Sequence, residues 1–232
     1  MSLLGWFLKK PKYDRLSDAY MTQRKWLWGE LKKAIEFQQA KKTSVWVVTH
    51  FPDQFLAVQD QLGSWQLDYR IIDQAIDPGR LAQLVRDDSL SPRPAVNLSL
   101  AEFLETNDRA ILDFDSQISV SMIAVERHPL VTKDQQLDRF ASSIPCHVRF
   151  GYYLALDDPL FQYFFPEKML SFLHHFGMRD DMLADSMIVT RAVNRAVRKL
   201  ARQTKADIQA DSAAEWLAKW EQANQSDQPD SP

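Results

Sequence analysis

Runs of apolar residues separated by amphipathic segments dominate the first two thirds of the chain. Residues 44–49 (SVWVVT) are continuously apolar and rich in β-branched side chains, which predicts a strand buried on both faces. Similar runs predict further strands at residues 68–73, 95–98, 110–114, 119–125 and 148–156. Helical spacing of apolar positions predicts helices at residues 16–40, 52–62, 77–87 and 134–142, with a short one at 100–105. Strands and helices that alternate with short connections favour a mostly parallel α/β sheet.

The last third of the chain has a different pattern. From residue 158 onward the spacing is helical, including a long helix over residues 185–205 and another over 212–224. We therefore expect four parts: an amphipathic N-terminal segment (1–15), an α/β domain (16–160), a helical extension (161–224) and a disordered tail (225–232).

Composition excludes several classes of protein. The chain has 232 residues, 45% of them hydrophobic, and a formal charge of −3, so it is not a globally basic nucleic-acid protein. The single cysteine, Cys146, excludes a disulfide framework and indicates a reducing cytoplasm. No apolar run reaches the ~20 residues that a membrane span needs, and residues 1–12 lack the pattern of a signal peptide. The six glycines are isolated, so no glycine-rich phosphate loop exists and an autonomous P-loop enzyme is excluded.

The triplet Glu126-Arg127-His128 directly follows a predicted buried strand. Ligands of open α/β sheets bind beyond the carboxyl ends of the strands, so this triplet lies where a site is expected. Arg127 could bind a phosphate and His128 could transfer a proton. The alternative is an internal ion pair beside a hydrogen-bonded histidine. The histidines show no metal-ligand spacing, and we expect no metal site.

Two basic segments are candidate contacts with an anionic surface. The predicted long helix carries cations at steps of four and three residues, which places them on one face: Arg191, Arg195, Arg198, Arg202 and Lys205. The N-terminal segment places aromatic residues next to lysines, as membrane-proximal helices do: Trp6, Phe7, Lys9 and Lys10. The alternatives are an ordinary solvated helix face and a segment packed on the domain.

Two blocks of sequence resemble SecA, the motor of preprotein translocation. Residues 123–160 are similar to the end of its second nucleotide-binding domain, on the matching positions Glu126, Arg127, His128, Asp134, Gln136, Leu137, Tyr153, Leu154, Leu156 and Asp158. Residues 173–199 are similar to the segment that leads into its scaffold helix, and residues 22–49 resemble its first helix and strand more loosely. The resemblance implies a RecA-like, three-layer αβα domain with a helical C-terminal extension. It also implies that ATP or ADP would contact Glu126, Arg127, His128, Asp134, Gln136 and Arg139.

The chain departs from the SecA family at the residues that perform chemistry. The two arginine-finger positions of the family hold Phe140 and Ser143 here, the family's glycine-arginine-threonine-aspartate motif is replaced by NLSLAE at residues 97–102, and the first motor domain with its P-loop is missing. We therefore expect no catalytic residue and no obligatory cofactor.

The resulting hypothesis is a non-catalytic SecA-like protein, an accessory or regulatory factor of preprotein translocation that acts by binding. Its expected partners are a translocase or SecA-type motor and anionic lipid at the inner face of the membrane, with no specific nucleic acid. One alternative is a nucleotide-sensing module that holds ATP or ADP at a residual half-site. The other is a small-molecule enzyme that uses Glu126 and His128, which would require a polar pocket around them.

Overall fold

The apolar runs of the sequence form one central sheet in the computed structural model, which describes residues 13–105, 115–164, 179, 184–185, 187–204 and 207–226. The strands within these ranges are β1 (Tyr13–Arg15), β2 (Ala19–Met21), β3 (Ser44–Thr49), β4 (Tyr69–Ile72), β5 (Val96–Leu100), β6 (Asp115–Ala124), β7 (Cys146–Ala155) and β8 (Ala184–Asp185). Their order is β4-β5-β3-β6-β7-β2-β8, and β1 lies beside the first half of β7. The pairings are parallel except the one between β2 and β8.

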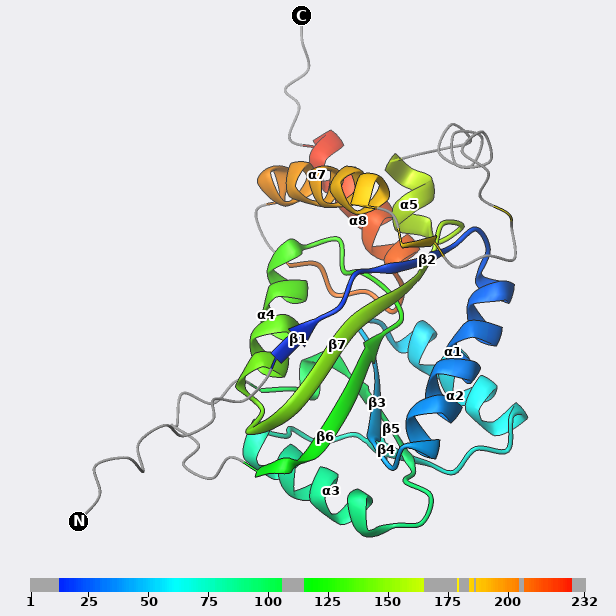
Figure 1. The fold of residues 1–232 in the computed structure, drawn as a ribbon. Helices are drawn as coiled ribbons and strands as arrows, with labels where there is room; N and C mark the ends of the chain where they lie inside the picture. The colour runs from blue at the N-terminus through cyan, green and yellow to red at the C-terminus, as the bar shows by residue number, and fades with distance from the viewer. Residues whose placement is uncertain are drawn as a thin grey trace, which may run out of the picture.

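Helices cover both faces of the sheet, as Figure 1 shows. Those of the described ranges are α1 (Arg24–Ala40), α2 (Pro52–Ser64), α3 (Pro78–Leu90), the 3-10 turn η2 (Ala101–Phe103), α4 (Val131–Ser143), α5 (Pro159–Phe164), α7 (Met187–Gln203) and α8 (Ala213–Ser226). Helices α1 and α2 pack on one face, and α3, α4, α7 and α8 contribute to the core on the other. The predicted three-layer α/β fold with a mostly parallel sheet is confirmed.

Strand β3 shows why the sequence folds in this way. All six of its residues are buried, as predicted for a strand covered on both faces. Val45 and Val47 point toward α1 and α2, whereas Trp46 and Val48 point toward the opposite core. At helix α3 the sequence also supplies the start signal, because the Asp77 carboxylate accepts hydrogen bonds from two backbone amides of its first turn.

The N-terminal part of the domain differs from the prediction. Residues 16–23 were expected to begin the first helix, but Ala19–Met21 form a strand and the helix begins at Arg24. The reason is tertiary: Ala19, Tyr20 and Met21 are all buried, and they pair in parallel with the second half of β7. Strand β1 likewise extends the sheet into the segment expected to precede the domain.

Several predicted elements lie outside the described residues. They include the strand at residues 110–114, the four membrane-proximal candidates near the N-terminus, Lys205, and the tail from residue 227 onward. Between residues 100 and 105 the predicted helix is a single 3-10 turn. None of the helices in the described ranges combines the length and apolar character needed to cross a bilayer.

Candidate functional site

The site predicted from the sequence lies where the direction of the chain connections changes. Strands β3 and β6 are neighbours, but the chain leaves β3 through α2 toward β4, and leaves β6 through α4 toward β7 on the other side. The crevice between such strands, at their carboxyl ends, is the usual ligand site of an open α/β sheet. His50 and Phe51 follow β3, and the triplet Glu126-Arg127-His128 follows β6, so the two segments face each other there.

Glu126 is bonded to the segment that begins helix α2. One oxygen of its buried carboxylate accepts hydrogen bonds from the backbone N–H of His50 (2.7 Å) and of Phe51 (2.9 Å). Burial raises the pKa of Glu126, although His50 and these two amides oppose the rise. Residue 52 is a proline without an N–H, and the amide of Asp53 donates to the carbonyl of Asp211. The helix start that could hold a phosphate is therefore occupied by the protein's own oxygens.

Arg127 is held between two buried carboxylates. Its Nη1 donates to Asp134 at 2.9 Å, its Nη2 pairs with Asp18, and its guanidinium lies over the Tyr152 ring at 4.2 Å. Burial acts to raise the pKa of Asp134, but the charge of Arg127 and the contact with His50 lower it to about 2. Arg127 is 9% exposed and doubly paired, so it has no free charge for a ligand phosphate.

His128 is a neutral, structural histidine. Its Nδ1 accepts a hydrogen bond from the backbone N–H of Leu130 at 2.9 Å, and its ring stacks on Phe51 with centroids 5.0 Å apart. The Trp216 ring packs edge-on against it. Burial, with a contribution from the neighbouring His50, lowers the pKa of His128 to about 3. This is the arrangement of the structural alternative, an internal ion pair beside a hydrogen-bonded histidine.

A second buried cluster at the same edge was missed by sequence reasoning. Arg24, at the start of α1, pairs with Asp158 and donates to the side chain of Gln54. Burial raises the pKa of Asp158 to about 7, against the effect of Arg24. In the sequence, Asp158 stands out only as a position that matches SecA. The sequence gives no indication that Arg24 or Asp18 belongs to the site, because both fall within the helix predicted at residues 16–40.

A cleft of about 680 Å³ opens beside the polar cluster. Its walls come from the loops after β3, β5 and β6, the first half of α4, and residues 207–210, which belong to a strap (residues 207–211) between α7 and α8. Of the six predicted nucleotide contacts, His128 and Gln136 line this cleft, whereas Glu126, Arg127 and Asp134 are buried behind it. Arg139 lies on the exposed side of α4, where its Nε donates to the carbonyl of Gln135.

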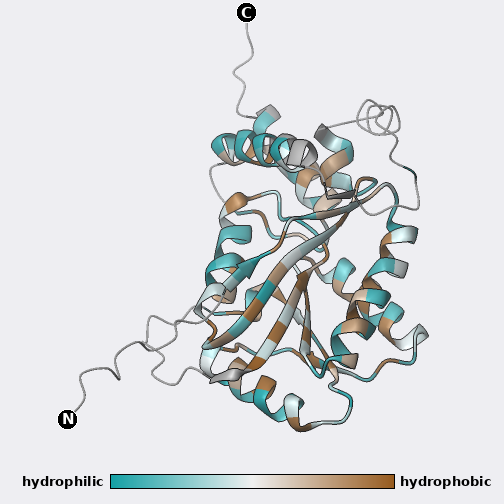
Figure 2. Cartoon of the chain, viewed as in Figure 1, coloured by the Kyte–Doolittle hydropathy of each residue, from teal (hydrophilic) through white to brown (hydrophobic). Residues whose placement is uncertain are grey.

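Helix α7 presents the predicted basic face to solvent. Arg191, Arg195, Arg198 and Arg202 are exposed, while Val197 and Leu200 are buried in the core. Within the part of the chain that the structure describes, none of the four arginines forms an ion pair. Figure 2, viewed as Figure 1, shows α7 at one end of the molecule, with many hydrophilic residues along the helix. Across that described part, no cluster of three or more histidine, cysteine, aspartate or glutamate residues could hold a metal ion.

Comparisons with known proteins leave the family open. No protein-family model matches the chain, and no curated protein matches it. Among solved structures, the chain is similar to one described as the crystal structure of the C-terminal part of the Fun30 ATPase domain, with 11% sequence identity and a TM-score of 0.39. The match covers 78% of this chain and 56% of that one, so the chain spans little more than half of that structure.

Proposed function

We propose that this chain is a non-catalytic RecA-like domain of the SecA type, which serves preprotein translocation by binding a partner. One observation carries the proposal: the two charged groups of the triplet at the carboxyl edge of the sheet, Glu126 and Arg127, are already bonded to other groups of the protein. The Glu126 carboxylate accepts the hydrogen bonds of the backbone amides at the start of α2, and the charge of Arg127 is neutralised by Asp18 and Asp134. Phosphoryl transfer needs free donors and cations around the transferred group.

The direct test is a pair of measurements on the purified chain. We expect no ATP hydrolysis above background, and no heat on calorimetric titration with ADP or ATP–Mg²⁺ up to several hundred micromolar. Robust hydrolysis by the chain alone would overturn the proposal.

The exposed face of α7 is the surface that we expect to meet the partner. Four arginines at steps of four, three and four residues lie on one face of the helix, and guanidinium groups bind phosphate and carboxylate in a bidentate manner. The chain should therefore sediment with vesicles that contain phosphatidylglycerol, and bind a purified SecA-type motor, in a salt-sensitive manner.

A pair of charge reversals makes this test specific. Arg195→Glu with Arg202→Glu should abolish both interactions. The control, Arg80→Glu with Arg93→Glu, makes the same charge change at two exposed positions, one in helix α3 and one three residues after its end. Helix α3 lies at the opposite end of the molecule from α7 in Figure 1. Equal loss of binding in the two double variants would contradict a role for α7.

A nucleotide-sensing module is the second candidate: the position of the cleft favours it, whereas the carboxylates of Glu102 and Glu105 that line the cleft do not. His128 and Gln136 line the cleft at the usual ligand position of the fold. Arg127→Ala is a poor test of this candidate, because it would leave Asp18 and Asp134 buried without their cation. Gln136→Ala should instead abolish any nucleotide heat if the cleft is the site.

The small-molecule enzyme has less support. It required a polar pocket around Glu126 and His128, but Glu126 is buried behind the cleft and bonded to backbone amides.

A further inference from the structure

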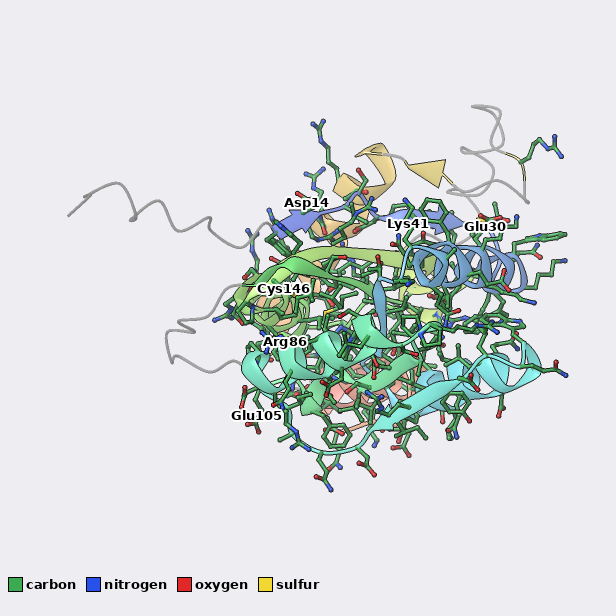
Figure 3. All side chains as sticks on the ribbon, turned by 60° about the horizontal axis from the view of Figure 1, so that its bottom comes forward. Asp14, Glu30, Lys41, Arg86, Glu105 and Cys146 are labelled. Carbon is green, nitrogen blue, oxygen red and sulfur yellow. The ribbon has the colours of Figure 1, made fainter. Side chains whose placement is uncertain are left out.

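The cleft beside the polar cluster carries an excess of negative charge. Three acidic residues of the described part of the chain line it: Glu102 in η2, Glu105 two residues after the end of η2, and Asp207 in the strap. Among the described residues, Lys133 is the cation that lines the cleft, and its Nζ is paired with Asp207 at 2.7 Å. Within the described ranges, neither Glu102 nor Glu105 forms an ion pair, and both side chains are exposed. Figure 3 shows Glu105 at the periphery of the molecule.

An anionic ligand would find little to hold it in this cleft. His128 is uncharged at neutral pH, since burial lowers its pKa to about 3. Arg127 is paired twice behind the wall, and the amides at the start of α2 are already bonded to Glu126. A phosphate would instead face the carboxylates of Glu102 and Glu105, which are unpaired among the described residues, and like charges at close range repel one another. The charge around the cleft therefore suits a cation.

The floor of the cleft suits the long side chains that carry a protein's cations. Phe51, Leu104 and Leu137 line the cleft and are each less than a tenth exposed, and the His128 ring stacks on Phe51. Arginine and lysine pack their methylene stems on such apolar surfaces while the charged head reaches the polar rim. The volume of about 680 Å³ lies within the roughly 300–1,000 Å³ of ordinary ligand pockets, and it exceeds the volume of a single side chain.

We propose that this cleft binds a basic polypeptide segment of a partner, with an arginine or lysine head between Glu102 and Glu105 and its stem over Phe51 and Leu137. The inference rests on the proposed function in one respect, that the chain acts by binding. The cleft would be a second binding surface, separate from the face of α7 and opposite to it in charge, and it would bind a cationic ligand where α7 binds an anionic one.

The test is a calorimetric titration of the full chain, at low ionic strength, with an acetylated and amidated tri-arginine peptide. We expect binding that weakens as salt is added and that is absent for the matched tri-glutamate peptide. Glu102→Gln with Glu105→Gln should weaken the affinity at least tenfold. The control, Asp60→Asn with Asp73→Asn, removes the same charge from exposed positions outside the cleft and should bind as the wild type does.

The outcomes separate this inference from the proposed function. Absence of tri-arginine binding, or equal affinity in the Glu102 and Glu105 double variant, would overturn the cleft assignment even if the chain proves inactive toward ATP. ATP hydrolysis would overturn the proposed function and leave a positive peptide result standing. Spermidine that binds as tightly as the peptide would replace the polypeptide with a small organic cation. All four side chains altered are exposed, so the variants should fold like the wild type.

Discussion

Two charged regions of this molecule behave in opposite ways. At the carboxyl edge of the sheet, Glu126 and Arg127 are buried and each is bonded to groups of the protein itself. On α7, four arginines are exposed and have no ion-pair partner within the described ranges. The residues that the sequence marks as candidates for catalysis or phosphate binding thus stabilise the fold. The charges that are available to a partner lie elsewhere: positive on α7, and negative at the rim of the cleft.

Substitution of Arg127 should have the largest effect on stability. Arg127→Met leaves Asp18 and Asp134 buried without a cation, and breaking a buried pair in this way costs about 3–5 kcal/mol. Urea denaturation followed by tryptophan fluorescence measures the free energy of unfolding. If the single variant does not fold, the triple variant with Asp18→Asn and Asp134→Asn should regain much of the lost stability. A loss below about 1 kcal/mol for Arg127→Met would mean that the two carboxylates do not depend on it.

Substitution of Glu126 should have the next largest effect on stability, and its size should depend on the replacing residue. Glu126→Ala leaves the amides of His50 and Phe51 without their acceptor, which costs about 1–3 kcal/mol for an unsatisfied buried group. Glu126→Gln keeps one oxygen in place and should lose less. Because burial raises the pKa of Glu126, loss of its charge is the smaller part of the cost. Equal destabilisation by the two replacements would contradict a role as hydrogen-bond acceptor.

His128 makes stability depend on pH in a stated direction. Its pKa is about 3 in the folded chain against an ordinary 6.5, so between these values the unfolded chain binds the proton more readily. Stability should therefore fall as pH decreases from about 6.5 toward 3, at up to about 1.4 kcal/mol per pH unit for one proton.

The variant His128→Asn isolates this contribution. An asparagine oxygen can replace Nδ1 as the acceptor for the amide of Leu130 but does not titrate. The difference between wild type and variant should shrink as pH falls through this window, and the opposing effect of Asp158, whose pKa burial raises to about 7, cancels in the comparison. Parallel stability curves for the two proteins would show that His128 does not titrate in this range.

The sequence predicts the layers and the place of the site better than it predicts what the site residues do. Local periodicity and β-branched runs mark the central strands and most helices, and the end of a buried strand marks the triplet. Asp18 was missed because its role depends on the pairing of Ala19–Met21 with β7, a contact more than a hundred residues away in the chain. The cleft was missed because the strap that completes it is an irregular segment without a periodic signal.

The smallest effect on stability should come from the region with the largest free charge. Arg195 and Arg202 are exposed on α7 and unpaired among the described residues, so replacing both with alanine should change the free energy of unfolding by no more than about 0.5 kcal/mol each. The same double variant should still lose affinity for phosphatidylglycerol vesicles, because binding to an anionic surface depends on the number of cations that reach it. A destabilisation comparable to that of Arg127→Met would mean that α7 uses these arginines to hold the fold together. The contrast between the internally paired charges at the carboxyl edge of the sheet and the unpaired arginines on α7 would then disappear. So would the reason to look for a partner at α7.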